Sequence, residues 1–306
     1  MTEEQRIKNL SVPQGKIDVV LDTDAYNEID DQFAIAYLLA SKEKLNTKAI
    51  YAAPFFNSRS KGPKDGMEKS YDEILKLLCL LKADIKVLKG AGAYLENESV
   101  PIISAAARDL AQRAKQYSPE HPLYVVAIGA ITNIASAILL EPQVAENTVV
   151  VWLGGHALHY HDTKEFNMKQ DVAAARVVMQ SGVPFVQLPC NGVVSEFRVS
   201  GPELEYWFVG KNEVSDYLSR NTIKEAESYA KGKPWSRCIW DATAVAWLLN
   251  DSDRFMRSRI TDTRLPMYDH HYGDERTGYS MRYVYHIKRD TLLEDMIKKI
   301  CANDEL

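Results

Sequence analysis

Cysteine is scarce in this sequence, and long apolar runs are missing from it. The four cysteines, Cys79, Cys190, Cys238 and Cys301, are scattered and form no CxxC pair, which argues against a zinc site of the paired-cysteine type. A disulfide framework is also not expected, so we predict free thiols in a reducing compartment, the cytoplasm. No apolar stretch approaches the roughly 20 residues of a membrane-spanning helix. The first ten residues are largely charged or polar and lack the apolar core of a signal peptide.

An excess of positive charge is also missing. Lys and Arg total 37 against 42 for Asp and Glu, so the chain is mildly acidic and a nucleic-acid partner is not expected. Apolar residues make up 46% of the 306 positions, which is enough for a large core. The sequence contains no internal repeat, low-complexity segment or evident linker, and we therefore predict a single domain over residues 1–306.

Strand and helix patterns alternate along the first two thirds of the chain. This alternation favours an α/β fold with a mostly parallel central sheet, flanked by helices on both faces, and a Rossmann-like core. The expected strands are 17–21, 48–53, 84–88, 123–128, 148–153 and 184–188, with an edge strand over 281–287. The expected helices are 33–39, 66–81, 99–116, 132–140, 171–181, 201–229 and 239–249. We expect the last third to pack over the carboxyl edge of the sheet.

Four aspartates crowd the end of the first expected strand. Asp22 and Asp24 follow its apolar residues, and Asp30 and Asp31 come just before the next helix. Ligands of open α/β sheets bind at the carboxyl ends of the strands. Carboxylates gathered there repel one another unless a cation offsets their charge, and oxygen ligands suit a hard divalent ion, Ca²⁺ or Mg²⁺. The alternative is that Asp30 and Asp31 only cap the helix, which leaves the first pair unexplained.

Later stretches also place polar residues at strand ends or helix starts. Thr132 follows the fourth strand, and Glu165 and Asn167 come after the glycine pair that ends the fifth. Asp241 opens an apolar helix. Each of these positions has a structural alternative, as a helix cap or as an acidic residue matched to the helix dipole.

Taken together and in order, these stretches resemble the motifs of the nucleoside hydrolases, enzymes that hydrolyse the N-glycosidic bond of ribonucleosides. The strand with D-x-D and D-D resembles the family's amino-terminal motif, and Gly129–Ala135 (GAITNIA) is similar to its GPLTNIA stretch. The GG…EFN…D segment over 154–171 and the acidic start of the apolar helix are similar to its two later motifs. The resemblance spans residues 19–249 and implies an inosine-uridine preferring hydrolase with the nucleoside hydrolase fold.

The resemblance implies a calcium site and assigns residues to it. Ca²⁺ would be bound by Asp24, Asp31, Asp241 and the main-chain carbonyl of Thr132. Asp22 would orient these ligands without binding the ion. A metal-activated water would attack C1′ of the ribose, and Asp24, close to both metal and water, is the candidate general base.

The resemblance also implies how a ribonucleoside would be held. Asp30, Asn57, Glu165 and Asn167 would bind ribose hydroxyls. Trp240 stands directly before the last aspartate, where many family members carry a histidine that helps protonate the leaving base. The purine-preferring branch carries a tryptophan there, which stacks on the purine and raises its basicity. The alternative for Trp240 is a place in the core.

One departure from the family pattern lies in the first motif. Between Asp24 and Asp30 the chain has five residues, where the common motif DxDPGxDD has three. Aromatic candidates for the walls around the base are Tyr26, Phe55 and Phe56. Four histidines are alternatives for protonation of the leaving group: His159, His161, His270 and His271.

Two other interpretations stay open. A strand that ends in D-x-D is also typical of the haloacid dehalogenase-type phosphatases, which would use Asp22 and Asp24 with Mg²⁺, although Tyr26 stands where Thr or Val is expected. The same fold with a ribose pocket could serve a protein that binds ribosyl ligands without catalysis. The expected partner is a small-molecule ribonucleoside, in purine salvage, with no nucleic acid and no membrane. The resemblance implies a homo-oligomer, either a dimer or a tetramer.

Overall fold

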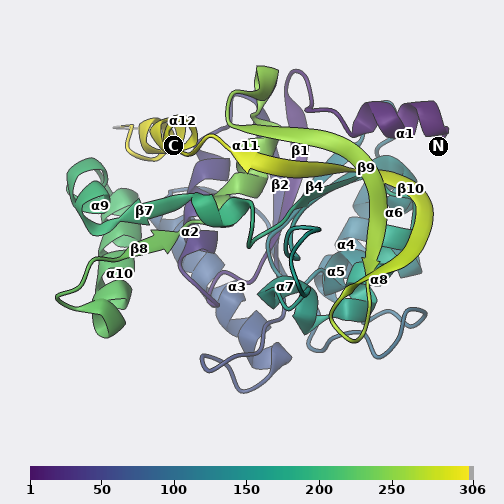
Figure 1. Ribbon diagram of the computed structural model, residues 1–306, viewed down its shortest axis with the longest axis horizontal. Coiled ribbons are helices and arrows are strands. Elements are labelled where there is room, and N and C mark those ends of the chain that lie inside the picture. Colours follow the sequence, from purple (N-terminus) through teal and green to yellow (C-terminus); the bar gives the residue numbers. More distant parts are fainter. Residues whose placement is uncertain (303–306) are drawn as a thin grey trace.

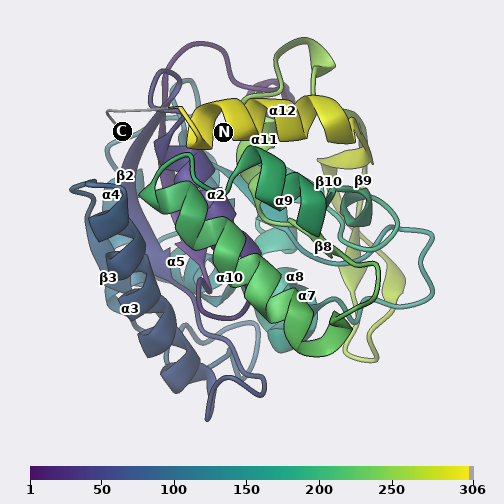
Figure 2. The ribbon, with the colours of Figure 1, turned by 90° about the vertical axis from the view of Figure 1, so that its left-hand side faces the viewer.

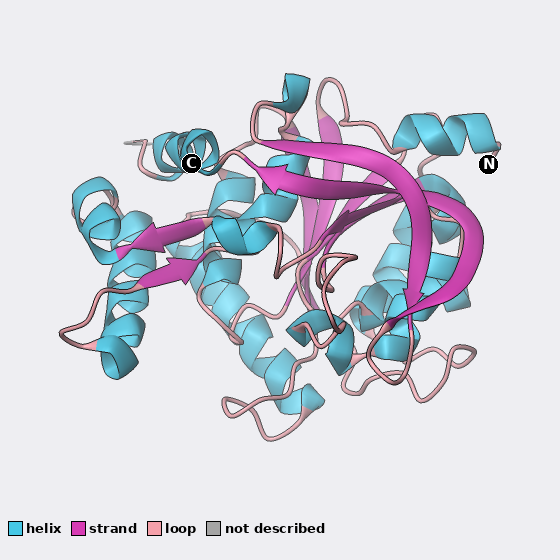
Figure 3. Ribbon diagram, viewed as in Figure 1, coloured by secondary structure: helices cyan, strands magenta, loops and turns pink. Residues whose placement is uncertain are grey.

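Eight strands make one central sheet, in the order β3-β2-β1-β4-β5-β6-β10-β9 (Figures 1 and 3). The computed structural model describes residues 1–302, and in it each neighbouring pair of these strands is parallel except β10 with β9. The strands are β1 (Ile17–Thr23), β2 (Leu45–Ala52), β3 (Val87–Lys89), β4 (Leu123–Ala127), β5 (Thr148–Leu153), β6 (Phe185–Leu188), β9 (Met256–Pro266) and β10 (Tyr272–Ile287). The prediction of a mostly parallel sheet is therefore confirmed.

Helices cover both faces of this sheet. One face is covered by α2 (Asp30–Leu39), α3 (Pro63–Leu80), α11 (Ala242–Leu248) and α12 (Arg289–Ile300), and the other by α4 (Ala105–Ala114), α5 (Thr132–Leu140), α6 (Gln143–Asn147) and α8 (Val172–Gln180). α10 (Glu213–Ala230) packs outside α2 and α3, with α9 (Gly201–Trp207) beside it (Figure 2). The remaining helices are α1 (Glu3–Asn9), α7 (Phe166–Gln170) and the short 3-10 helices η1 (Val194–Glu196) and η2 (Asp251–Asp253). Over the described part of the chain, none of these helices combines the length and the apolar character needed to cross a bilayer.

Successive residues of the central strands point to opposite faces and build two cores. In β1, Val19 and Leu21 join the core that contains α2, whereas Val20 joins the core that contains α4 and α5. Both sides of the strand are apolar because both are buried, as expected of a parallel sheet. Asp22 is an exception in this apolar strand, because it is an acidic residue and is fully buried.

The carboxyl ends of the central strands lie side by side. In the register of the sheet, Asp22 pairs with Tyr51 of β2 and Ala127 of β4. β1 extends to Thr23, beyond the predicted end at residue 21, so Asp22 belongs to the strand and Asp24 begins the loop. This arrangement brings the loops after β1, β2, β4 and β5 to one edge of the sheet.

The prediction of an edge strand over 281–287 is wrong. These residues belong to β10, which lies between β6 and β9, and β9 is the edge strand. Most side chains of β9 are exposed or half-buried and many are charged or polar, so its sequence has too little apolar periodicity to identify it. β9 and β10 arch together across one side of the molecule (Figure 1), so this part of the last third extends the sheet rather than covering its carboxyl edge.

The predicted helix over 201–229 is two helices. The chain turns at Gly210, whose φ of +78° favours glycine, and Asn212 then caps α10 with its side chain on the Ser215 N–H. Two short strands flank this pair of helices and were not predicted from the sequence: β7 (Arg198–Ser200) and β8 (Ser236–Cys238). They form a separate antiparallel ribbon (Figure 3).

Candidate active site

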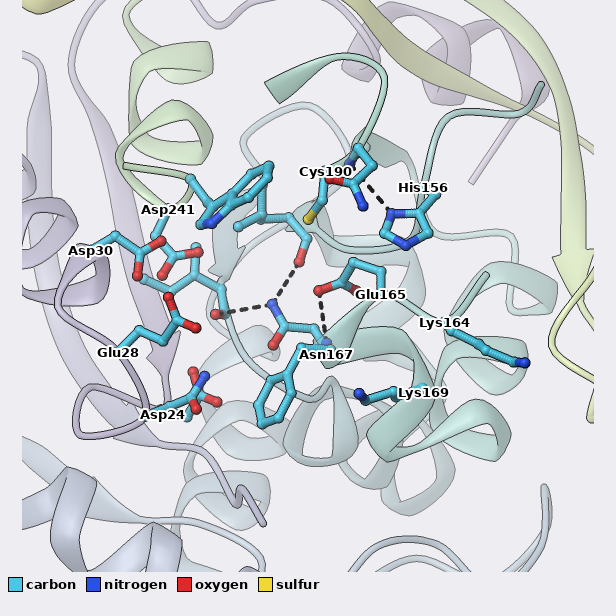
Figure 4. Close-up of a pocket in the computed structure, with 16 residues that line it drawn as sticks. Asp24, Glu28, Asp30, His156, Lys164, Glu165, Asn167, Lys169, Cys190 and Asp241 are labelled. Carbon is cyan, nitrogen blue, oxygen red and sulfur yellow. Dashed lines mark hydrogen bonds between the residues drawn. The ribbon is translucent and has the colours of Figure 1, made fainter. Parts of the chain in front are cut away.

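A cavity of about 290 Å³ opens at the carboxyl edge of the sheet (Figure 4). Six of the residues predicted from the sequence line it: Asp24, Asp30, Glu165, Asn167, Trp240 and Asp241. Four others are not among its lining residues: Asp22, Asp31, Asn57 and Thr132. The cavity therefore lies where an α/β sheet binds its ligands, and three of the four sequence motifs supply residues that line it.

Three aspartates form a compact cluster at the base of this cavity. Carboxylate oxygens of Asp30, Asp31 and Asp241 all lie within 4.8 Å of one another, and all three residues are buried. Asp30 and Asp31 open α2, whose N-cap position is Ile29 and has no side-chain cap. The two aspartates therefore do not act as N-cap residues, and the cap interpretation does not account for the cluster.

Asp24 faces the cluster from the end of β1 without a hydrogen-bond partner. Neither of its carboxylate oxygens has a partner, although the residue is only 1% exposed. The loop after β4 runs directly over it, because a Cβ added at Gly129 would lie 3.1 Å from Asp24 Oδ1. A buried carboxylate without a partner is costly, so this arrangement calls for a ligand that supplies positive charge or hydrogen bonds.

The electrostatics of the cluster are those of crowded, desolvated acids. Burial raises the pKa of Asp24, Asp30 and Asp241 well above the usual range of aspartate, and repulsion from neighbouring carboxylates raises it further. Burial also raises the pKa of Asp31 to about 7, although Thr23 donates a hydrogen bond to it. A divalent cation among these oxygens would offset the repulsion and favour the ionised forms, so the donor set fits a hard metal ion.

Asp22 lies behind Asp24 and is held by Asn133. The Asn133 Nδ2 donates to Asp22 Oδ1 at 2.8 Å, while Oδ2 of the aspartate has no partner. The Asn133 Oδ1 accepts from the Ala91 N–H at 2.8 Å, which ties the loop after β3 to the end of β1. Burial raises the pKa of Asp22 to about 7.

Thr132 turns its side chain away from the cavity. Its hydroxyl donates to Asp171 Oδ2 at 2.7 Å, and the same carboxylate accepts from the N–H groups of Leu95 and Ala174 at 2.9 Å each. Asp171 therefore caps α8. The predicted metal-binding role of Thr132 concerns its main-chain carbonyl and stays a prediction.

Glu165 and Asn167 form the middle of the cavity wall (Figure 4). The Glu165 carboxylate accepts three main-chain hydrogen bonds at 2.8–2.9 Å, from Gly155, Asn167 and Met168, and so caps α7. The Asn167 Nδ2 donates to main-chain carbonyls at the ends of β4 and β5, at 3.2 and 3.0 Å. Both side chains are thus fixed in place by the backbone, with part of each facing the cavity.

The aromatic residues at the cavity are only partly those predicted. Trp240 is half-buried, packs against the core and lines the cavity, so its two predicted environments are both real. Phe166 also lines the cavity and was not predicted. None of the three aromatic candidates lines it: Phe55 is fully buried, and Tyr26 and Phe56 are 40% and 53% exposed.

The longer loop after Asp24 brings two unpredicted residues to the cavity. Asn27 and Glu28 both line it. The Asn57 Nδ2 donates to Asn27 Oδ1 at 2.6 Å, so Asn57 supports a lining residue instead of lining the cavity itself. Glu28 Oε2 accepts from Arg237 Nη2 at 3.0 Å. The departure in loop length was the available signal, but a length difference does not say which side chains turn inward.

The histidine at the cavity is His156. It is 6% exposed, its Nδ1 accepts from the Asn191 N–H at 3.3 Å, and burial lowers its pKa. The four histidines suggested by the sequence are not among the lining residues: His159, His161, His270 and His271. His156 directly follows the glycine pair at the end of β5, and this adjacency was the signal that could have identified it.

Comparison with known sequences identifies one family. The model of the inosine-uridine preferring nucleoside hydrolases matches residues 19–290. The pyrimidine-specific ribonucleoside hydrolase RihA of Citrobacter koseri is 27% identical over 248 residues, which cover 72% of this chain and 76% of RihA. RihA of Salmonella typhimurium is 26% identical over 259 residues, which cover 76% and 79% of the two chains.

Solved structures share the fold. A plant nucleoside hydrolase, the PpNRh1 enzyme, has a TM-score of 0.73 at 17% identity and covers 95% of this chain and 100% of its own. The purine-preferring ribonucleoside hydrolase from Gardnerella vaginalis has a TM-score of 0.68 at 20% identity, with 93% and 98% coverage. The type III effector protein XopQ, solved with adenosine diphosphate ribose, has a TM-score of 0.70 at 16% identity, with 99% and 100% coverage.

The family match covers most of the chain and includes all four motifs, three of which supply residues that line the cavity. It therefore excludes the phosphatase interpretation, in which Asp22 and Asp24 would act with Mg²⁺. The protein is a member of the inosine-uridine preferring nucleoside hydrolase family, a hydrolase that acts on the N-glycosidic bond of ribonucleosides.

Proposed function

We propose that this enzyme hydrolyses purine ribonucleosides to free base and ribose in a Ca²⁺-dependent reaction. The observation that carries this proposal is the buried cluster of Asp30, Asp31 and Asp241 beside the partner-free carboxylate of Asp24. A cluster of this kind costs free energy unless a cation occupies it, and its all-oxygen donor set suits Ca²⁺.

The metal would be held by Asp24, Asp31, Asp241 and the main-chain carbonyl of Thr132. Asp22, hydrogen-bonded to Asn133, keeps the end of β1 in place behind these ligands. When bound, Ca²⁺ lowers the pKa of a coordinated water and polarises oxygens of the ribose.

Residues that line the cavity have different roles in the reaction. Asp24 accepts the proton of the attacking water, and its two carboxylate oxygens, which have no partner within the protein, leave it free to do so. Asp30 accepts hydrogen bonds from ribose hydroxyls, and Glu165 and Asn167 hold the sugar from the adjacent wall. Because their side chains are fixed by main-chain groups, they bind the sugar with little loss of side-chain entropy.

Trp240 supports the preference for a purine. Its indole lines the cavity next to Asp241 and offers a flat apolar face, with Phe166 as a second aromatic group. The curated relatives named above are pyrimidine-specific, whereas the Gardnerella enzyme is purine-preferring, so the base preference of this chain needs its own measurement. We also propose a cytoplasmic homo-oligomer, built from a single domain over residues 1–306.

A panel of nucleosides tests the function. Release of reducing sugar from inosine, guanosine, uridine and cytidine is measured with Ca²⁺, with Mg²⁺ and with chelator. We expect inosine and guanosine to turn over, Ca²⁺ to support the reaction and chelator to abolish it. In Trp240→Leu, purine turnover should fall about tenfold, a value at the upper end of aromatic stacking energies. Turnover confined to pyrimidines would overturn the base preference, and full activity in chelator would overturn the metal dependence.

A further inference from the structure

The cavity has two walls of opposite character. The acidic wall consists of Asp24, Glu28, Asp30 and Asp241. The basic wall consists of Lys164, Lys169 and His156, on the other side of Glu165 and Asn167 (Figure 4). The metal and the sugar account for the acidic wall, but hydrolysis of a neutral nucleoside gives no role to the basic one.

The lysines of the basic wall are free to meet a ligand. Among the described residues, neither ammonium lies within 4.0 Å of a carboxylate. The Lys169 Nζ lies 5.4 Å from the centroid of the Phe166 ring, which itself lines the cavity. In Figure 4 the Lys169 side chain reaches back toward Asn167, whereas Lys164 extends outward.

The other cation near the cavity is already paired. Arg237 donates to Glu28 at 3.0 Å and lies 3.5 Å from Glu225, so its charge is used within the protein. Glu165, the acidic residue nearest the basic wall in sequence, already accepts three main-chain hydrogen bonds. Arg237 is therefore not available to a ligand, and the Glu165 carboxylate is not paired with either lysine.

His156 adds a neutral donor to the basic wall. Its Nδ1 accepts a hydrogen bond from the Asn191 N–H, so the proton of the neutral ring lies on Nε2. The nearest carboxylate oxygen to Nε2 is on Asp162, at 3.9 Å, which is too long for a hydrogen bond. The basic wall therefore combines two exposed ammonium groups with one imidazole N–H, a set of donors that suits a phosphate.

We propose that the preferred substrate carries a phosphate on the 5′-oxygen of its ribose. The inference rests on the proposed function, which places the 2′- and 3′-hydroxyls at the acidic wall and the sugar against Glu165 and Asn167. The 5′-carbon of a ribose held in this way points away from the metal cluster, toward Lys169. The phosphate contacts the Lys169 ammonium first, and Lys164 can swing inward to join it.

The reaction on such a substrate is the same hydrolysis. An O–C1′ bond forms from water and the C1′–N bond breaks, with its electron pair passing to the base. The base nitrogen takes up a proton, and the water loses one to Asp24. The products are the free base and ribose 5-phosphate, and no oxidant, reductant or second substrate is needed.

Comparison of inosine with inosine 5′-monophosphate tests the proposal. We expect wild type to show a higher kcat/KM for the monophosphate, and Lys169→Met to lower that value about tenfold while kcat/KM for inosine stays unchanged. Loss of one charge-assisted contact to phosphate corresponds to a change of this size. Lys16→Met, at an exposed position before β1 and at the opposite end of the strand from the cavity, is the matched control and should alter neither value. A wild-type preference for inosine, or an equal loss for both substrates in Lys169→Met, would overturn the proposal.

A binding measurement separates this proposal from the proposed function. If neither compound is hydrolysed, the proposed function fails, and calorimetry of the Ca²⁺-loaded protein with ribose 5-phosphate and with ribose decides the phosphate site independently. Tighter binding of ribose 5-phosphate that is lost in Lys169→Met supports the site. Equal binding of the two sugars by wild type contradicts it.

Discussion

Aspartates near the two ends of β1 are in opposite situations. Near the amino end, Asp18 accepts hydrogen bonds from Asn46 at 2.6 Å and from Tyr117 at 2.8 Å, and Lys48 lies 3.5 Å from it. Near the carboxyl end, Asp22 has a partner on one oxygen only and Asp24 has none. Burial favours protonation of Asp18 too, but its partners outweigh burial and its pKa is lowered, whereas the pKa of the other two is raised.

This comparison distinguishes an acid that stabilises the fold from acids kept for a ligand. A structural carboxylate is supplied with donors by its neighbours, and its ionised form then favours folding. The carboxylates at the cavity have mainly one another as neighbours. Their mutual repulsion favours the protonated form unless a cation is bound. Repulsion among these carboxylates lowers the free energy of unfolding of the metal-free protein. In return, the binding site is already formed before the ligand binds.

Exchange of one acid at each end of β1 gives the largest expected contrast. Asp24→Asn should lower kcat about 1,000-fold, within the range of a lost general base, with little loss of stability because the side chain has no partner to lose. Asp18→Asn should leave kcat unchanged and lower the free energy of unfolding by about 1 kcal/mol, the size of a lost hydrogen bond. Steady-state kinetics and urea unfolding of both variants measure these effects. If Asp18→Asn loses as much activity as Asp24→Asn, the distinction between structural and catalytic aspartates is wrong.

The second-largest expected contrast between the aspartates near the two ends of β1 is in the effect of Ca²⁺ on thermal stability. At a free Ca²⁺ concentration 100 times the dissociation constant, a bound ion adds about 2.7 kcal/mol to the stability, which raises the Tm by about 5 °C in a protein of this size. This shift should disappear in Asp241→Asn, because the cluster with Asp30 and Asp31 loses one charge. Asp18→Asn should keep the full shift. A calcium shift that survives in Asp241→Asn would place the metal elsewhere.

The smallest expected effect is on the pH dependence of stability without metal. The pKa of Asp22 is raised from 3.8 to about 7, so the folded state holds this proton at pH values where the unfolded state has lost it. Stability therefore falls as the pH rises through this window, and Asp22→Asn should remove that contribution. We expect the variant to gain about 2 kcal/mol relative to wild type between pH 5 and pH 6.5, in chelator. Urea unfolding at both pH values measures it, and a difference that is constant with pH would contradict the assignment.

Much of the site could be predicted because strand ends are predictable. A parallel sheet gathers the residues that follow its strands at one edge, which placed Asp24 there, and the resemblance to the family's motifs added Glu165 and Asn167. Asp241 could be added because an acidic residue at the start of an apolar helix resembles a family motif. In these cases the sequence showed both a polar residue and its position at the end of a strand or the start of a helix.

The remaining residues depend on contacts that no local pattern contains. Glu28 turns into the cavity where Arg237, more than 200 positions later in the chain, meets it. Lys169 and His156 line the cavity because of how α7 and the loop after β5 are folded back, and neither has a periodic neighbour to reveal this. β9 was missed for a related reason: an edge strand in which most side chains are exposed or half-buried lacks the apolar pattern by which strands are recognised.

The hydroxyl of Tyr272, at the start of β10, has a consequence for how the enzyme is made. It donates to the main-chain carbonyl of His156 at 2.9 Å and accepts from Gln187 at the same distance, and Tyr283 accepts from the Leu158 N–H. The loop that carries His156 is thus held by residues more than 100 positions later in the chain, and the acidic wall is complete only with Asp241. A nascent chain on the ribosome therefore has most of the sheet before it has a complete pocket. Completion of the pocket therefore depends on Asp241 and on β10, both of which come late in the sequence.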